Sequence, residues 1–216
     1  MTVERAIRRA RRRYHTLVAD PPWRFDDQLP GPARGASKHY TTLSLDELLE
    51  YPLPPLYGDG GEGSGGARLF LWRVAAMQDA ALALMAAWGF ELKSELVWVK
   101  VTRGGLHRLG LAGEGGGSSS SGLLRIGMGR QVRMAHEVCL IGVRGKVERL
   151  SAAVPSVLFA ERSRGVSVDG GRGSEHSRKP AAFYDLVERL SPGPYCELFG
   201  REQRPGWTVY GDELRP

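Results

Sequence analysis

Apolar residues gather in seven short runs along the chain, separated by polar or glycine-rich segments. The runs cover residues 14–20, 67–73, 95–101, 136–143, 156–161, 196–200 and 207–211. Several are almost continuously apolar, which is typical of strands that helices cover on both faces. Because helical segments alternate with these runs, the pattern predicts an α/β fold whose sheet is mostly parallel, with helices on both faces.

Two helices are expected from composition and spacing. Residues 75–88 are rich in alanine, leucine and methionine and end at Gly89, a natural helix stop. Residues 180–190 place apolar side chains every three or four positions, which predicts one buried stripe made of Phe183, Leu186, Val187 and Leu190. Pro180 suits the first helical turn. Lys179 is therefore expected at a helix N-terminus.

Three segments rich in glycine and serine interrupt the pattern, at residues 58–66, 113–122 and 164–173. Such segments cannot bury enough apolar surface to offset the entropy lost on ordering. We expect them to form flexible surface loops.

The chain has 216 residues, 42% of them hydrophobic, which is enough for one sizeable core. We expect a basic N-terminal arm at residues 1–14 and one domain at residues 15–216. No apolar run approaches the roughly 20 residues of a membrane span, and the N-terminus lacks the apolar centre of a signal peptide. A cytoplasmic protein without a membrane partner is expected. Cys139 and Cys196 lie in apolar runs, so buried free thiols are favoured over a disulfide.

The formal net charge of +6 favours a polyanionic partner. The densest cluster of positive charge consists of Arg8, Arg9, Arg11, Arg12 and Arg13. Guanidinium groups suit phosphate oxygens, so the arm is expected to contact nucleic acid, with a salt-dependent affinity. A solvated helix or a mobile arm would explain the same cluster.

The stretch VADPPWRF, residues 18–25, ends the first predicted strand with unusual chemistry. The two prolines fix the backbone and remove two N–H donors, leaving a rigid turn in which acceptors dominate. The Asp20 carboxylate and the Pro21 carbonyl can converge on one amino group, and the Trp23 indole offers a face for a flat ring. An exocyclic amine of a nucleobase fits this description, although a purely structural turn would use the same residues.

Such an amine is a weak nucleophile because its lone pair is delocalised into the ring. Two acceptors holding its hydrogens would aim the lone pair at an electrophile, where positioning supplies much of the catalysis. Because an aspartate with its ordinary pKa of about 3.9 is a poor base at neutral pH, we expect Asp20 to orient the amine. The base must also leave its stack to reach such a turn.

The sequence resembles the adenine-N6 methyltransferases typified by the catalytic subunit of the eukaryotic messenger-RNA adenosine methyltransferase, with bacterial and phage relatives. The resemblance covers the chain from Val18 to Leu214. Its landmarks occur in the family's order: VADPPW, HYTTLSLDEL, LFLW, WGFELKSELVWVK, HEVCLIGVRGK, SRKP, VERLSPG, ELFGR and GWTVYGDEL. The resemblance implies a Rossmann-like S-adenosylmethionine-dependent methyltransferase fold with a permuted motif order. It also implies methyl transfer from S-adenosylmethionine to the N6 amine of adenine in nucleic acid.

By this resemblance, the catalytic residues are Asp20, Pro21, Pro22 and Trp23. Tyr40 and Glu137 match family residues that contact the acceptor base. A loop aromatic packed on the core, or a solvated charge at a strand end, would explain these two residues equally well.

The resemblance also implies a binding site for the methyl donor near the C-terminus. Lys179 would approach the carboxylate of the cofactor. Arg201 would lie at the edge of the cofactor. Asp212 and Glu213 would contact the ribose hydroxyls. The full set of implied cofactor residues is Asp20, Lys179, Phe199, Gly200, Arg201, Asp212 and Glu213. No metal site is expected, because none of the five histidines has a histidine or cysteine at metal-ligand spacing.

Other functions remain open at this point. The chain could be a catalytically silent, nucleic-acid-binding partner subunit, although the family's silent partners lose the acid or the tryptophan of the DPPW motif. It could also act on cytosine or on a small molecule. DNA is favoured over RNA because the small size resembles bacterial and phage members, and a homodimer or heterodimer is compatible with the family.

Overall fold

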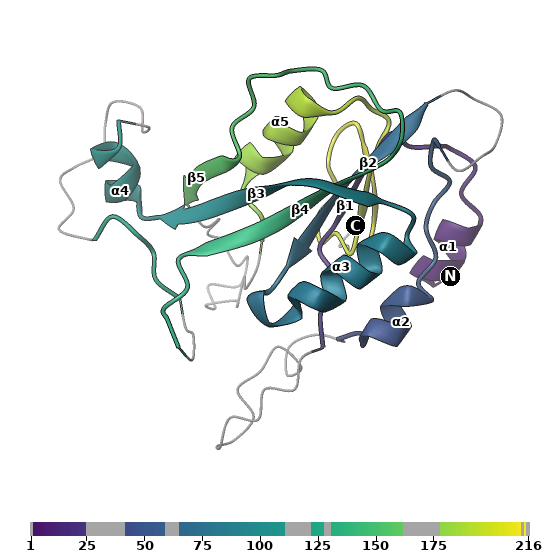
Figure 1. The fold of residues 1–216 in the computed structure, drawn as a ribbon, viewed down its shortest axis with the longest axis horizontal. Helices are drawn as coiled ribbons and strands as arrows, with labels where there is room; N and C mark the ends of the chain where they lie inside the picture. Colours follow the sequence, from purple (N-terminus) through teal and green to yellow (C-terminus); the bar gives the residue numbers. More distant parts are fainter. Residues whose placement is uncertain are drawn as a thin grey trace, which may run out of the picture. The chain divides into compact units, whose positions relative to one another are not determined.

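The computed structural model describes residues 2–24, 42–58, 65–110, 122–127, 131–161, 178–212 and 214 (Figure 1). The helices are α1 (Val3–Arg8), α2 (Leu45–Leu49), the 3₁₀ helix η2 (Ala75–Met77), α3 (Gln78–Ala87), α4 (Arg103–Arg108) and α5 (Ala181–Leu190). The strands are β1 (Thr16–Ala19), β2 (Gly66–Arg73), β3 (Glu91–Val101), β4 (His136–Gly145), β5 (Val157–Glu161), β6 (Tyr195–Leu198) and β7 (Trp207–Tyr210).

Each of the seven apolar runs forms a strand, as predicted. Hydrogen bonds connect the strands in the order β5-β3-β4-β2-β1-β6-β7. β1 pairs in parallel with β2 and β6, β6 with β7, and β3 with β5. β4 runs antiparallel to β2. The prediction of a mostly parallel sheet is confirmed, and β4 makes the sheet mixed.

The chain divides into two compact units. The first contains residues 1–95, 138–152 and 190–216, and the second contains residues 96–137 and 153–189. β3 and β4 each have residues in both units.

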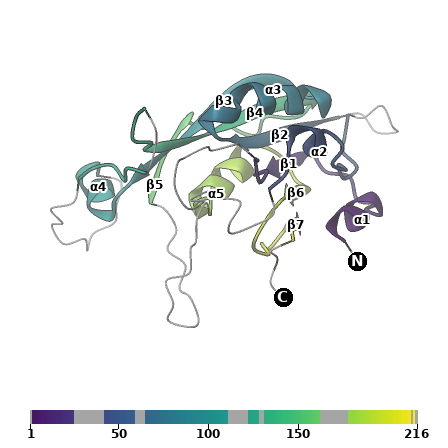
Figure 2. The ribbon, with the colours of Figure 1, turned by 90° about the horizontal axis from the view of Figure 1, so that it is seen from below.

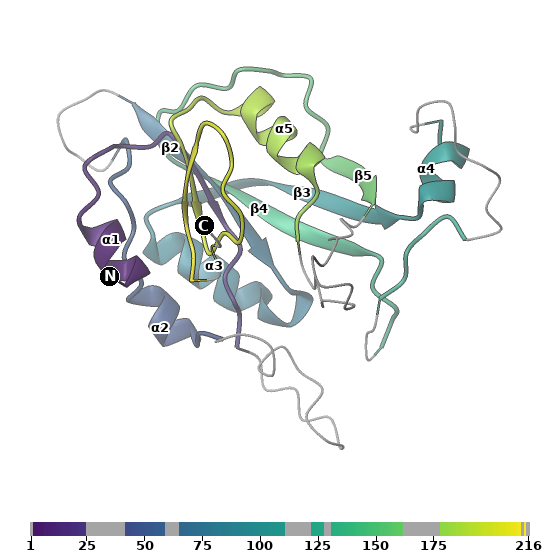
Figure 3. The same cartoon turned by 180° about the vertical axis from the view of Figure 1, so that it is seen from behind.

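The core of the first unit is built around β1, all four of whose residues are buried. Both neighbours, β2 and β6, are also largely buried, which explains their continuous apolar runs. α3 packs against β2 and against α2 (Figures 1 and 2). β6 and β7 continue the sheet beyond β1 (Figure 2). Figure 3 shows α2 and α3 from behind.

The core of the second unit includes the inward-facing residues of β3 and the apolar stripe of α5. Trp98 is fully buried and its indole N–H donates to the Ala160 carbonyl at 3.0 Å, which links β3 to β5. Phe183 and Val187 of α5 are also fully buried, as their helical spacing predicted.

The helices depart from expectation in detail. The segment 75–88 begins as the 3₁₀ helix η2 and becomes α-helical only at Gln78. α1, α2 and α4 were not predicted as elements. They are five or six residues long, which is too short to show the helical spacing of apolar residues.

The predicted glycine-rich loops lie largely outside the described residues. Both cysteines are buried and free, as expected. Within the described ranges, the structure contains no helix with the length and apolar character needed to cross a membrane.

Candidate active site

Asp20 directly follows β1, at an edge of the sheet where several sequence-distant residues meet. The register pairs Ala19 with Leu198 of β6, and Leu198 with Tyr210 of β7. The chain segments that follow these three strands therefore leave the sheet at the same edge. This edge, at the carboxyl ends of parallel strands, is where open α/β sheets bind ligands.

The turn from Pro21 to Trp23 is held by hydrogen bonds from its neighbours. The Pro22 carbonyl accepts from the Leu43 amide, and the Pro21 carbonyl from the Trp23 amide, both at 2.8 Å. A carbonyl oxygen has two lone pairs, so Pro21 keeps acceptor capacity for an incoming donor. Asp20 and Pro22 are half-buried, whereas Pro21 is buried.

The Trp23 side chain anchors the turn to β2. Its indole N–H donates to the Trp72 carbonyl at 3.1 Å, and the residue is only 5% exposed. Stacking of an acceptor base on Trp23 stays a prediction. What the structure adds is a fixed position for the indole.

The strand ends next to Asp20 are joined through two glycines. The Gly200 amide donates to the Tyr210 carbonyl at 3.0 Å. A Cβ at Gly211 would collide with the Gly200 backbone, and one at Gly200 would collide with Val209. The resemblance implies a cofactor contact at Gly200, and the structure adds a second reason for a glycine at this position in the packing of the two loops.

Phe199 adopts a left-handed backbone conformation, with φ of 62°, which is uncommon for a residue with a side chain. Its ring packs against Tyr51 with centroids 4.7 Å apart. Burial raises the pKa of Tyr51, and the Asp212 carboxylate and Glu4 raise it further, so the phenol stays protonated. Tyr51 thus lies beside two predicted cofactor residues, a placement that no spacing in the sequence signals.

In the second unit, Glu137 binds two lysines. Its Oε1 lies 2.6 Å from Lys100 Nζ, and its Oε2 lies 3.3 Å from Lys179 Nζ. Burial works to raise the pKa of Glu137, but Lys179 and Lys100 outweigh it and hold this pKa below its ordinary value. The carboxylate is therefore ionised, and the three residues carry one net positive charge.

The two lysines that contact Glu137 differ in exposure and in whether the sequence predicted a role for them. The Lys179 side chain is only 4% exposed, and it lies just before α5, as predicted. Lys100 was not predicted as a site residue. Its Nζ also lies 5.3 Å from the centre of the Trp98 ring.

The remaining predicted residues fall in two groups. Arg201 is half-buried and Asp212 exposed, each following its strand in the first unit. Tyr40 and Glu213 lie outside the described residues. Nowhere in the described ranges do three histidine, cysteine, aspartate or glutamate side chains gather as they would to hold a metal ion.

Comparison with known proteins identifies the family. The model of the MT-A70 family matches residues 14–213, nearly the whole chain. The chain belongs to the MT-A70 family. It is 28% identical over 206 residues to the N(6)-adenosine-methyltransferase MT-A70-like protein of Drosophila melanogaster and to the N(6)-adenosine-methyltransferase catalytic subunit METTL3 of Homo sapiens. It is 25% identical over 222 residues to the type II methyltransferase M.MunI of Mycoplasma sp.

Coverage differs among these relatives. Each alignment includes 94% of this chain, but only 27% of the Drosophila protein and 28% of the human protein. For M.MunI the alignment covers 79% of the relative. The chain thus spans about a quarter of the length of the N(6)-adenosine-methyltransferases that it matches.

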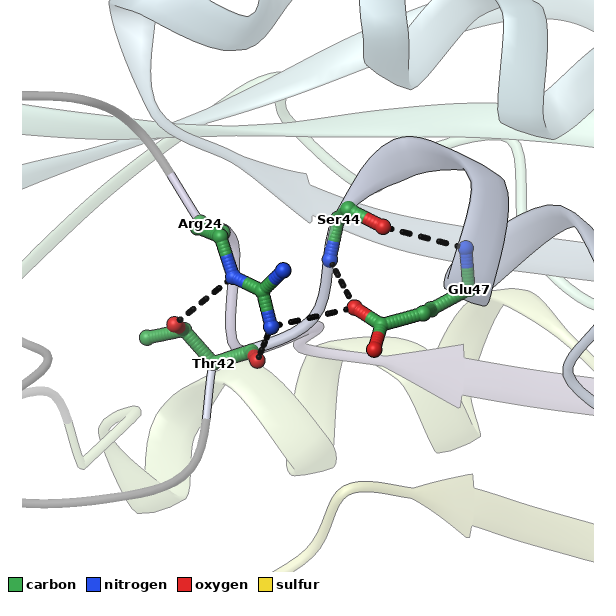
Figure 4. Close-up of polar contacts among 4 residues, drawn as sticks. All are labelled: Arg24, Thr42, Ser44 and Glu47. Carbon is green, nitrogen blue, oxygen red and sulfur yellow. Dashed lines mark hydrogen bonds and ion pairs between the residues drawn. The ribbon is translucent and has the colours of Figure 1, made fainter.

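One arrangement in this MT-A70 chain was not foreseen from sequence. Arg24, which follows the DPPW motif, contacts Thr42 and the start of α2 (Figure 4). Its Nη2 donates to the Thr42 carbonyl at 2.8 Å and lies 3.1 Å from Glu47 Oε2. An arginine after a turn gives no sequence signal, because its partners lie about 20 residues further along the chain.

Proposed function

We propose that the chain transfers a methyl group from S-adenosylmethionine to the N6 amine of adenine in nucleic acid. The observation that carries this proposal is the edge shared by the turn at Asp20 and the loops at Gly200 and Asp212. In the reaction a methyl donor and an amine acceptor must lie next to each other, and this edge offers groups suited to both.

The acceptor side of the proposal rests on Asp20 and Pro21. Their oxygens would accept the two amine hydrogens and aim the nitrogen lone pair at the methyl group. A new N–C bond forms as the S–C bond breaks, and the extra proton then leaves the amine for solvent. Asp20 orients the amine and is not required to remove the proton.

The donor side fits the residues next to Asp20. S-adenosylmethionine, when bound, supplies an activated methyl group on a sulfonium. Phe199 and Tyr51 offer aromatic surface, and the Asp212 carboxylate is an acceptor suited to ribose hydroxyls. Arg201 is proposed to contact the edge of the cofactor. A contact of Lys179 with the cofactor carboxylate stays a prediction from the resemblance.

We assign the chain a Rossmann-like methyltransferase fold with helices on both faces of the sheet and a permuted motif order. Support comes from the order of the elements: the catalytic turn follows β1, the first strand, whereas the proposed donor loop follows β6. The parallel pairing of β1 with β6 nevertheless makes these two segments neighbours.

The proposed acceptor is adenine in DNA rather than in RNA. Support for DNA comes from the type II methyltransferase M.MunI, since the alignment with this chain covers 79% of that relative.

The test is incubation of the purified chain with labelled S-adenosylmethionine and separate DNA and RNA pools, followed by mass spectrometry of the nucleosides. N6-methyladenine in the DNA pool is expected. Asp20→Ala should abolish incorporation while calorimetry shows a largely intact donor affinity. An Asp20→Ala variant with parental turnover would refute the mechanism, and absence of donor binding by the parent would favour a silent partner subunit.

A further inference from the structure

The DPPW turn depends on donors supplied by other segments, because Pro21 and Pro22 have no N–H of their own. The Leu43 amide and the Trp23 indole provide two of the links that hold this turn. Arg24 adds a third set of links, since its main chain and its side chain both bond to the segment that precedes α2.

The contacts of Arg24 converge on a few atoms. Its amide donates to the Leu43 carbonyl at 2.9 Å, and its Nη2 to the Thr42 carbonyl at 2.8 Å. Its Nε lies 3.4 Å from Thr42 Oγ1. The guanidinium fork therefore fixes both the direction of the side chain and the position of the backbone that leaves the turn.

The acidic partner of Arg24 is itself held in place (Figure 4). Glu47 Oε2 accepts from the Ser44 amide at 2.7 Å, and the Glu47 amide donates to Ser44 Oγ at 3.2 Å. These reciprocal bonds form a capping box at the start of α2. One carboxylate oxygen thus joins the cap of α2 to the residue that follows the DPPW motif.

We propose that Arg24 and Glu47 are positioning residues that hold the Pro21–Trp23 turn in its reactive geometry. The catalytic part of this inference rests on the proposed methyl transfer, and the positioning part does not. Small displacements of an orienting group can reduce a rate by up to about 100-fold, so a turn with few donors of its own needs such support.

Because Arg24 and Glu47 are exposed, a positioning role can be distinguished from a contribution to the stability of the whole fold. The Arg24 and Glu47 side chains are 47% and 49% exposed. Exposed ion pairs contribute little to the stability of the whole fold. Loss of the pair should therefore change turnover and local dynamics, with little effect on the melting temperature.

The experiment compares Arg24→Met and Glu47→Gln with the parent. A glutamine side chain can still accept from the Ser44 amide, so Glu47→Gln removes mainly the charge. Each variant is expected to lower kcat about tenfold with KM for S-adenosylmethionine unchanged. Arg24→Lys should recover part of the loss. The double variant Arg24→Met/Glu47→Gln should lose no more than Arg24→Met alone, because the ion pair is already broken in that variant.

Two controls lie at the ends of the same helix. Glu50→Gln makes the same substitution at an exposed residue that has no ion pair in the described ranges, and it should behave as the parent does. Ser44→Ala removes the cap hydroxyl and leaves the Arg24 contact. A loss of kcat in Ser44→Ala as large as that in Glu47→Gln would overturn the proposal, because folding of α2 would then explain both.

Amide hydrogen exchange tests the positioning role and does not require the protein to be catalytically active. The Leu43 and Arg24 amides and the Trp23 indole N–H should exchange about tenfold faster in Arg24→Met and Glu47→Gln than in Glu50→Gln. Unchanged exchange at all three groups would refute the proposal. A parent that methylates no acceptor would refute the proposed function instead, and the exchange rates would still decide on the pair.

Discussion

Lys179 Nζ lies 3.3 Å from Glu137 Oε2. The family resemblance gives these residues different ligands, the carboxylate of the cofactor for Lys179 and the acceptor base for Glu137. Their direct contact means that Lys179 helps to keep Glu137 ionised. With Lys100 on the second carboxylate oxygen, Glu137 balances two cations of which one is almost fully buried.

Glu137→Gln should destabilise the protein, because it removes the negative charge that contacts both Lys100 and Lys179. We expect the free energy of unfolding in urea to fall by about 2 kcal/mol, less than for a fully buried pair because Glu137 is 23% exposed. Glu91→Gln is the matched control, since it breaks an exposed pair with Lys93. That control should stay within about 0.5 kcal/mol of the parent, and an equal loss in both variants would contradict the assignment.

The same cluster predicts a dependence on pH. The pKa of Glu137 is lower in the folded protein than its ordinary value of 4.5, so the stabilisation is fully present above pH 4.5. It is lost as the pH falls through the lower folded pKa. The difference in unfolding free energy between parent and Glu137→Gln should therefore be constant at neutral pH and shrink in acid, as measured by urea titrations at several pH values.

Gly211→Ala should disturb the edge next to Asp20. The added methyl group would collide with the Gly200 backbone, so the loops after β6 and β7 must separate. We expect a loss of about 1 to 3 kcal/mol in unfolding free energy, accompanied by weaker donor binding in calorimetry. Gly122→Ala has open space around it and should change neither quantity. Parental donor affinity in Gly211→Ala would argue against a cofactor site at this edge.

The arginines of the N-terminal segment should contribute to nucleic-acid binding. Arg8 and Arg9 are exposed, and α1 is held to the domain by the buried Ile7. Arg8→Gln/Arg9→Gln should reduce the slope of log affinity against log salt by about 0.9 for each phosphate that is no longer neutralised. Arg149→Gln/Arg189→Gln removes two other exposed arginines and is the control. Equal slopes for the two double variants would show that the α1 arginines bind phosphate no better than other surface arginines do.

Local patterns were sufficient for much of the fold. Each of the seven strands was legible as an apolar run, and the α5 stripe predicted burial of Phe183 and Val187. Strand direction could not be predicted, because a buried antiparallel strand such as β4 has a composition like that of the parallel strands.

The candidate site was predictable only where its chemistry is concentrated in a few consecutive residues. The DPPW turn could be predicted as a site from its prolines and the residues beside them. No sequence pattern indicated Arg24, Tyr51 or Lys100. Each of these three acquires its role from a partner far along the chain: Glu47, Phe199 or Glu137. Such pairings depend on tertiary contacts that spacing within one segment does not encode.

The two buried thiols offer a chemical measure of how the sheet opens. Cys139 on β4 and Cys196 on β6 are both fully buried, and burial, followed by the charge of Glu197, raises the pKa of Cys196. Alkylating reagents attack the thiolate, so neither sulfur can react until its strand parts from its neighbours and the thiol ionises. Iodoacetamide can therefore be used on the unaltered chain, without any introduced label. Its rate of reaction with Cys139 reports how often β4 separates from its neighbours, and its rate with Cys196 reports the same for β6.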